Sequence, residues 1–328
     1  VNYPVRVEFS NIPAFLRASS TIGALATTQF IPNPTCALDL GVLSLTDYAQ
    51  NDPDVYVPIW YNGDPADASL AGHFAFSKYS YSTSSEASVI PGGIAADISP
   101  AVAPYSQTGP TWGLAWDKNN KKLYAGAVLR RHAGLGPQGL GGLYRYDPVT
   151  NLVVGTDLTS LGLNFGSIGS NAARGIGNVL NPSYDLEAFE KVGKAGIGGI
   201  SISDDGTKLF VMNLFLKKIH VLSVPGLTLI QTLDVPNPLC AGGDYRPWSV
   251  KYYKNKLYVG VICDGQISQN KSNMKASVYE MNPTTGAYTA ILEFPLTYPK
   301  GTARAGTESG WFPWTDDYLL QVAVNPVV

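Results

Sequence analysis

Three stretches of the chain repeat one pattern of hydrophobic and polar positions. Each has a run in which apolar and polar residues alternate, a polar turn of Asp, Asn, Lys and Gly, and a second run of β-branched and aromatic residues. The three stretches are Trp112–Gly126, Gly198–Met212 and Tyr245–Gly260. Aligned without gaps, they superpose Lys122-Leu123-Tyr124, Lys208-Leu209-Phe210 and Lys256-Leu257-Tyr258. Alternation of this kind predicts two antiparallel strands joined by a tight turn.

A second hairpin pattern follows each stretch, and its turn carries a proline in all three copies. The hairpins begin at Gly142, Lys218 and Ala276, and the matching prolines are Pro148, Pro225 and Pro283. A fixed φ favours such a turn, where the missing N–H donor costs nothing. Four antiparallel strands per unit, repeated along the chain, are typical of a propeller blade. The sequence therefore predicts an all-β propeller of four-stranded antiparallel blades, five to seven in number.

The remaining segments fit this repeat less regularly. Val55–Tyr61 and His73–Tyr81 predict two strands of an earlier blade, and residues 82–111 an irregular connection with one outer strand. Residues 156–195 form a long loop insertion with one short helix, Tyr184–Val192, for which Ser183 is the expected N-cap.

Both chain ends carry strand patterns. Residues 1–53 comprise a strand, Val1–Phe9, and a connection, and Tyr318–Val328 is a final strand with no hairpin after it. Pairing of Val1–Phe9 with residues 311–328 would close the ring and make residues 1–328 a single propeller domain. An edge left open would instead invite pairing with another chain.

Composition and charge narrow the classes of protein and partner. The 328 residues include 34 Gly, 23 Pro and 19 Tyr but only 15% charged residues, which suits many short strands joined by tight turns. The net charge is −2 and the basic residues do not cluster, so nucleic acid is not an expected partner. No run of 18 apolar residues exists, so no membrane span is expected. The start at Val1, without Met, favours a processed, exported chain.

The three cysteines favour one disulfide. Cys240 lies six residues before Arg246, where an innermost strand begins, and Cys263 ends the next strand. The start of one antiparallel strand and the end of the next meet at the same edge, so a bridge with Cα atoms about 5.5 Å apart is reasonable in an exported chain. Two buried free thiols are the alternative. Cys36 is left over, as a small buried residue or an intermolecular partner.

Several charged side chains are expected on one rim of the central channel. The insertion between the second and third strands of the first repeat spans residues 130–142, and that of the third repeat spans residues 263–275. Both emerge where the innermost strands begin. The rim residues predicted to contact a ligand or partner are therefore Arg130, Arg131, His132, Arg246, Trp248 and Asp264.

The chemistry of these residues leaves alternatives open. His132 is either a base or metal ligand, or a loop histidine that organises its insertion. Without a second His or carboxylate at ligand spacing, we expect no metal and no cofactor. The three arginines either bind an anion or sugar acid, or pair with backbone carbonyls and acids of neighbouring blades. His73 and His220 are expected to be structural. Asp204-Asp205-Gly206 fits a hairpin turn better than a calcium loop.

Tryptophans recur near the predicted blade starts, at Trp112, Trp116, Trp248, Trp311 and Trp314. Core packing is the default interpretation, and an exposed Trp at the rim would make a carbohydrate platform. No Gly-x-Ser-x-Gly nucleophile motif is present, and the glycines of residues 134–142 lack the spacing of a phosphate-binding loop.

Residues 110–315 resemble a propeller-like region of large bacterial cell-surface proteins that carry B domains of the serine-aspartate-repeat type. The most specific parts are Arg131-His132-Ala133-Gly134-Leu135-Gly136-Pro137 and Arg246-Pro247-Trp248. The resemblance implies surface display rather than a defined reaction. The chain departs from that family's pattern by ending shortly after Trp311-Phe312-Pro313-Trp314 and by showing no B domain.

The sequence thus predicts a non-catalytic, secreted or surface-displayed structural or adhesive module. Self-assembly into a filament or layer through the end strands extends that hypothesis, with the protein itself or other surface proteins as partners. One alternative is a glycan-binding module that uses rim Trp and Arg. Another is a propeller hydrolase or lyase with an axial metal.

Overall fold

The structure of the chain is a computed structural model that describes residues 4–13, 16–19, 26–35, 38–44, 52–81, 101–180, 183–299 and 310–317. The chain forms two compact units. Val1–Tyr56 and Lys78–Pro100 make up the N-terminal unit, and Val57–Ser77 and Ala101–Val328 make up the propeller unit. One propeller domain over residues 1–328, as the sequence predicts, stays a prediction.

The propeller unit contains three four-stranded antiparallel sheets, one for each sequence repeat. The first comprises β8 (Thr111–Asp117), β9 (Lys122–Ala127), β10 (Gly142–Asp147) and β11 (Leu152–Asp157). The second comprises β12 (Ile197–Ile202), β13 (Lys208–Asn213), β14 (Lys218–Ser223) and β15 (Leu229–Asp234). The third comprises β16 (Tyr245–Tyr253), β17 (Lys256–Cys263), β18 (Lys275–Met281) and β19 (Tyr288–Pro295). The hairpins predicted from the alternating pattern are confirmed.

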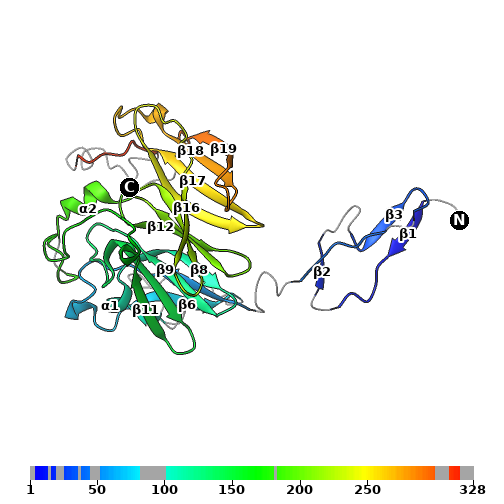
Figure 1. The fold of residues 1–328 in the computed structure, drawn as a ribbon, viewed down its shortest axis with the longest axis horizontal. Helices are drawn as coiled ribbons and strands as arrows, with labels where there is room; N and C mark the ends of the chain where they lie inside the picture. Colours follow the sequence, from blue (N-terminus) through cyan, green and yellow to red (C-terminus); the bar gives the residue numbers. More distant parts are fainter. Residues whose placement is uncertain are drawn as a thin grey trace. The chain divides into compact units, whose positions relative to one another are not determined.

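The first strands of these sheets, β8, β12 and β16, lie next to one another at the centre of the propeller unit (Figure 1). A further sheet has the order β5 (Asp54–Pro58), β6 (Phe74–Ser80) and β7 (Ala101–Pro104), where two strands and one outer strand were predicted. The fold is therefore all-β and propeller-like. The number of blades and the way the ring closes stay predictions.

Strand β13 shows why the middle repeat is so apolar. Its residues Leu209 and Val211 join one buried cluster with Tyr124 and Leu143 of the first sheet. Its residues Phe210 and Met212 point the other way, into a second cluster with Val250, Leu257 and Val259 of the third sheet. A strand with both faces covered loses the apolar–polar alternation, because neither face contacts water. The sheets thus stack face to face.

The predicted short helix exists, but its N-cap differs from the expectation. Helix α2 spans Leu186–Lys191, and its N-cap is Asp185, in the left-handed region with φ 44°. The prediction of Ser183 was wrong, because its hydroxyl bonds to His132 instead. The other helical segments in the described part of the chain, all short, are α1 (Tyr105–Thr108), η2 (Ala68–Leu70), η3 (Gly139–Gly141), η4 (Leu158–Leu161) and η5 (Lys271–Asn273).

The described residues at the start of the N-terminal unit form two small sheets. Strand β1 (Val5–Glu8) pairs antiparallel with β3 (Thr28–Ile31), and β2 (Leu16–Ala18) pairs antiparallel with β4 (Val42–Ser44). The strand predicted at Val1–Phe9 thus exists as β1, with β3 as its partner. Its predicted pairing with residues 311–328 is not tested, since residues 318–328 lie outside the described residues and 311–317 form no strand. Cys36 also lies outside them.

Candidate functional site

The loop that follows β9 is docked onto two other segments of the propeller unit. The N–H of Gly63 donates to the carbonyl of His132 (2.9 Å), and the N–H of Gly134 donates to the carbonyl of Gly63 (2.9 Å). The guanidinium of Arg131 donates from Nε (3.0 Å) and Nη2 (2.8 Å) to the carbonyl of Tyr184. The loop therefore joins residues near β5 to the long insertion that carries α2.

Close packing explains the glycines of the Arg-His-x-Gly-x-Gly-Pro segment. A Cβ built on Gly134 would lie 2.7 Å from both Asn171 Nδ2 and Pro65 Cδ. A Cβ on Gly136 would lie 2.3 Å from the carbonyl oxygen of Thr108, which is backbone and cannot turn aside. Glycine at position 136 lets two backbone segments cross in contact, and glycine at position 134 leaves room for the side chains of Asn171 and Pro65.

His132 is held by its backbone and by its ring. It adopts φ 67°, in the left-handed region that non-glycine residues seldom occupy. Its N–H donates to Asp185 Oδ2 (2.8 Å), and its Nδ1 lies 3.0 Å from Ser183 Oγ. Burial is the main cause of a lowered His132 pKa, and the charge of Arg131 adds to it, while Asp185 opposes it. The imidazole is therefore neutral at pH 7, and the contacts match a histidine that organises its loop.

Arg174 ties the same segments together from inside. Its Nε and Nη2 bond to the two carboxylate oxygens of Asp185 at 2.9 and 2.7 Å. Its Nη2 also lies 3.0 Å from the carbonyls of Arg130 and Ala133. Both charged side chains are fully buried. Sequence reasoning missed this pair because neither residue stands in a motif, and each lies in the irregular insertion 156–195.

A pocket of about 510 Å³ opens beside His132. It is lined by Asn62, Gly63, His132, Ile176, Gly177, Val179, Leu180 and Ser183. The lining combines apolar side chains with the Ser183–His132 pair, so the pocket offers both contact area and hydrogen-bonding groups. Of the predicted rim residues, only His132 lines it.

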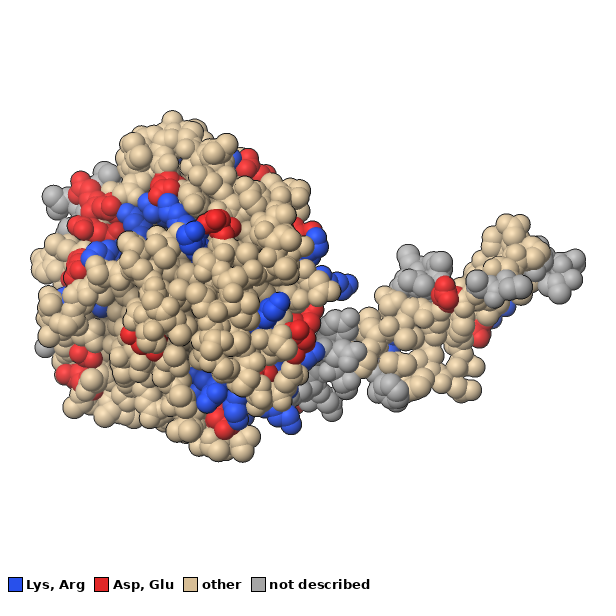
Figure 2. Space-filling view, in the orientation of Figure 1, with Lys and Arg blue, Asp and Glu red and all other residues tan. Residues whose placement is uncertain are grey.

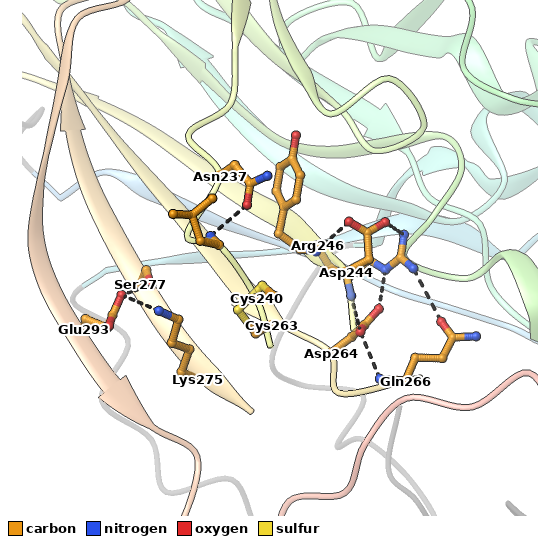
Figure 3. The surroundings of a disulfide bond; sticks show 12 residues. Asn237, Cys240, Asp244, Arg246, Cys263, Asp264, Gln266, Lys275, Ser277 and Glu293 are labelled. Atoms are coloured by element: carbon orange, nitrogen blue, oxygen red, sulfur yellow. Dashed lines mark hydrogen bonds and ion pairs between the residues drawn. A yellow bond between two sulfur atoms is a disulfide. The ribbon is translucent and has the colours of Figure 1, made fainter. Parts of the chain in front are cut away.

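Arg246 and Asp264 form a second cluster on the third sheet (Figure 3). Arg246 Nε donates to Asp264 Oδ2 at 2.8 Å, and Asp264 Oδ1 accepts the N–H groups of Asp244 (2.8 Å) and Gln266 (3.0 Å). The Asp264 side chain is fully buried. Burial would raise the pKa of Asp244, but its ion pairs with Lys217 and Arg246 outweigh that and lower it. Arg246 is thus engaged by acids that flank strands of its own sheet, whereas the prediction named acids of neighbouring blades.

The predicted disulfide is present directly beside this cluster. Cys240 and Cys263 are bonded, with their Cα atoms 5.3 Å apart (Figure 3). Cys263 immediately precedes Asp264, so the covalent link and the ion pair hold the same end of β17. The carbonyl of Asp264 accepts the N–H of Trp314 (2.8 Å), which brings the segment 310–317 onto this end as well.

Three tryptophans form a row across the starts of the innermost strands. The ring centroids of Trp60 and Trp112 lie 5.5 Å apart, and those of Trp112 and Trp248 lie 5.7 Å apart. The guanidinium of Arg130 lies 4.8 Å from the Trp60 ring centroid. The structure thus links Arg130 to Trp248 through the row, whereas Arg131 and His132 contact the insertion at residues 183–185. Trp60 was not predicted: it lies just after β5, whereas Trp112 and Trp248 lie near the starts of β8 and β16.

Other candidate residues have structural roles. His220 is buried, and its ring bonds to Asn213 (3.1 Å) and Thr232 (3.0 Å), while burial lowers its pKa to about 4. The Asp204-Asp205-Gly206 segment joins β12 to β13, as the hairpin interpretation requires. Within the described ranges, no group of three or more His, Cys, Asp and Glu side chains is placed to hold a metal ion.

Charges on the surface are mixed rather than segregated. On the face in Figure 2, Lys and Arg side chains lie next to Asp and Glu, with broad uncharged areas between them. Ion pairs such as Lys122–Asp147 and Lys256–Glu280 join opposite charges within the described residues. No helix in the described part of the chain is both long and apolar enough to cross a membrane.

Comparison with known proteins finds distant relatives. No protein-family model matches the chain. Three proteins of Dictyostelium discoideum are similar to it: Colossin-A is 26% identical over 65% of this chain, Colossin-C 22% over 71% and Colossin-D 22% over 88%. The chain spans only 2%, 23% and 29% of their respective lengths. The resemblance to bacterial surface proteins stays a prediction, since these relatives are from Dictyostelium.

Solved structures give only a loose likeness. A chain of the nidogen/laminin complex matches 76% of this chain and 65% of its own length, with a TM-score of 0.39 and 10% identity. Hydrazine synthase of Kuenenia stuttgartiensis matches 74% of this chain and 51% of its own, with a TM-score of 0.37 and 13% identity. Scores at this level carry no argument about function.

Proposed function

We propose that this protein is a secreted or surface-displayed structural module, without catalytic activity, that assembles with copies of itself through the strands of its N-terminal unit. The observation that carries the proposal is the exposure of apolar side chains on the described short strands of that unit. The disulfide supports an oxidising, extracellular setting.

The described residues of the N-terminal unit bury few apolar side chains. Among its described residues, Ala26 is the one buried apolar side chain, while Phe30 is 68% exposed and Val42 is exposed as well. Its sheets have two strands each, of three or four residues. A two-stranded sheet is at best marginally stable in water, and stability generally requires a third strand or a packed face. We infer that another chain supplies this.

Open strand edges give the partner a binding mode. In a two-stranded sheet each strand has one edge of N–H and C=O groups with no ladder partner, and such edges pair with strands of other chains. Burying one exposed Phe or Val side chain contributes about 1.5–3 kcal/mol. A few such side chains on each of two paired strands would offset the entropy of ordering a short segment.

The outer strand β19 offers a matching edge on the propeller unit. The first six of its eight residues are all exposed, and they include the large side chains Tyr288, Ile291 and Leu292. Strand β15 of the second sheet is shorter and keeps one residue, Leu233, buried. We therefore propose β19 of one copy as the receiving edge for N-terminal strands of the next.

Truncation tests the assembly directly. Deletion of residues 1–9 removes β1, and we expect the full chain to form oligomers or polymers, seen by light scattering and electron microscopy, that the truncated chain does not form. Leu292→Lys in β19 should also reduce assembly, and Leu152→Lys in the outer strand of the first sheet serves as the matched control. Assembly unchanged by the deletion contradicts the proposal. Assembly lost on deletion but unchanged in Leu292→Lys contradicts only the choice of β19.

A further inference from the structure

The tryptophan row is built by an irregularity that recurs in all three innermost strands. In each, two residues lie opposite a single residue of the next strand, which is a β-bulge. Register shifts fall between Thr111 and Leu114 in β8, between Ile197 and Ile200 in β12, and between Pro247 and Ser249 in β16. These bulges place Trp112-Gly113, Gly198-Gly199 and Trp248-Ser249 opposite Gly126, Met212 and Gly260. Bulges often re-aim a side chain beside a functional site.

Glycines in the bulges bring the three strands close enough for the indoles to meet. A Cβ on Gly113 would lie 2.7 Å from Ile200 N, and a Cβ on Gly198 would lie 2.6 Å from the carbonyl oxygen of Trp248. The middle strand therefore carries no side chain at the position where its neighbours carry Trp. Trp112 of the first sheet contacts Trp248 of the third across this gap, and the angle between the two ring planes is 64°.

The centre of the row remains open to solvent. Trp112 is 42% exposed, although the Trp60 ring stacks on it and the Trp248 ring contacts it edge to face. Trp60 is fixed by a hydrogen bond from its Nε1 to the carbonyl of Thr111 (2.7 Å). A rigid, exposed indole between two others is a surface for a ring-shaped ligand with an apolar face. The pyranose ring of a sugar has such a face, and its hydroxyls lie around the edge.

Arg130 adds a charge at the end of the row. Its guanidinium lies over Trp60 and has no ion pair or side-chain hydrogen bond to any described residue. By contrast, Arg131, Arg174 and Arg246 each donate to oxygen atoms of the chain. A guanidinium with unused N–H donors matches a carboxylate in geometry and charge.

We propose that Trp60, Trp112, Trp248 and Arg130 form a binding site for an acidic glycan. A pyranose ring contacts the exposed part of the Trp112 indole, and the carboxylate of a uronic or sialic acid residue pairs with Arg130. The site is independent of the strands through which the chain is proposed to assemble.

Binding to defined oligosaccharides tests the proposal. The probes are oligogalacturonate, a hyaluronan tetrasaccharide and sialyllactose, with maltotetraose, chitotetraose and lactose as neutral counterparts, measured by calorimetry and by tryptophan fluorescence. We expect at least one acidic probe to bind and its neutral counterparts to bind at least about tenfold more weakly, since one ion pair of this kind corresponds to about that factor.

Variants assign the binding to named side chains. Trp112→Ala should lower the affinity for the acidic probe by about tenfold. Trp112→Phe should keep most of that affinity, because it retains an aromatic face. Arg130→Gln should lower the affinity for the acidic probe and leave that for the neutral probes unchanged. Arg130→Lys should bind the acidic probe with an intermediate affinity. Tyr288→Ala, an exposed aromatic on β19, is the control and should bind as the parent protein does.

Three results would overturn the proposal. The first is no binding of any acidic probe by the parent protein. The second is binding that Trp112→Ala leaves unchanged while near-ultraviolet circular dichroism shows the variant to be folded. The third is equal affinity for acidic and neutral probes together with no effect of Arg130→Gln.

Discussion

Arg174 and Asp185 form a bidentate ion pair, with N–O distances of 2.9 and 2.7 Å, and both side chains are fully buried. The pair lies at the junction of the His132 loop, the insertion and α2, and Asp185 also accepts the N–H of His132. Removing one partner of a buried ion pair leaves the other charge buried and unpaired. The substitution therefore costs more free energy of unfolding than the intact pair contributes on balance.

Asp185→Ala should therefore lower the free energy of unfolding by about 3–5 kcal/mol. Chemical unfolding followed by tryptophan fluorescence measures the change. Asp234→Ala is the matched control, because Asp234 pairs with Lys218 on the surface and should change stability by no more than about 1 kcal/mol. A small effect at Asp185 would mean that Arg174 finds other acceptors or water.

His220 predicts a loss of stability in mild acid. Burial lowers its pKa to about 4 in the folded chain, while an unfolded histidine titrates near 6.5. Between these values the unfolded chain binds more protons, so stability falls as the pH falls from about 6.5 to 4, by up to about 3 kcal/mol. His220→Gln should flatten the dependence of the unfolding midpoint on pH. An unchanged slope in that variant would assign the effect to other groups, such as His132.

Reduction of the disulfide should loosen one end of the third sheet. The Cys240–Cys263 bridge closes a loop with a sequence separation of 23 residues, for which the loss of unfolded-state entropy corresponds to about 3 kcal/mol. The double variant Cys240→Ser and Cys263→Ser should lower stability by about that amount. Hydrogen exchange should increase at Asp244 and Gln266, whose N–H groups bond to Asp264. Equal exchange in the oxidised and reduced proteins would contradict this.

Gly136→Ala should disrupt the docking of the His132 loop. The new Cβ would lie 2.3 Å from the carbonyl oxygen of Thr108, so one of the two backbones must move. We expect a loss of about 1–3 kcal/mol, measured by chemical unfolding. Gly177→Ala is the control, since a Cβ there meets no atom within 4 Å. Similar stabilities of the two variants would show that the loop yields at little cost.

The regular part of the fold was predictable from local pattern. Strands such as β9, β13 and β17 align by their Lys-Leu-aromatic start, and the prolines mark the turns of the outer hairpins. The disulfide followed from the antiparallel geometry, because Cys240 and Cys263 flank one hairpin edge. These features depend on neighbours close in sequence, where alternation and turn chemistry carry the information.

The contacts of the site depend on segments far apart in sequence, which no local pattern specifies. Arg174 and Asp185 stand in an irregular insertion, and Ser183 was expected to cap α2 but faces His132. The tryptophan row could not be seen in the alignment of the repeats, because the turns between their first two strands differ in length. The turn after β8 has four residues, 118–121, and the turn after β16 has two, 254–255, so an alignment without gaps sets Arg246, rather than Trp248, opposite Trp112.

The shared bulge has a consequence for how such a protein diversifies. It provides one variable position in the first and in the third sheet, where Trp112 and Trp248 stand on a backbone path that is already set, whereas the middle sheet must keep glycine because a Cβ on Gly198 would lie 2.6 Å from the carbonyl oxygen of Trp248. Exchanging Trp112 or Trp248 for another residue type alters what the row presents, because the backbone at the bulge is shaped by the glycines. A repeated scaffold can in this way acquire a new preference for a ligand through a single substitution in one of its copies.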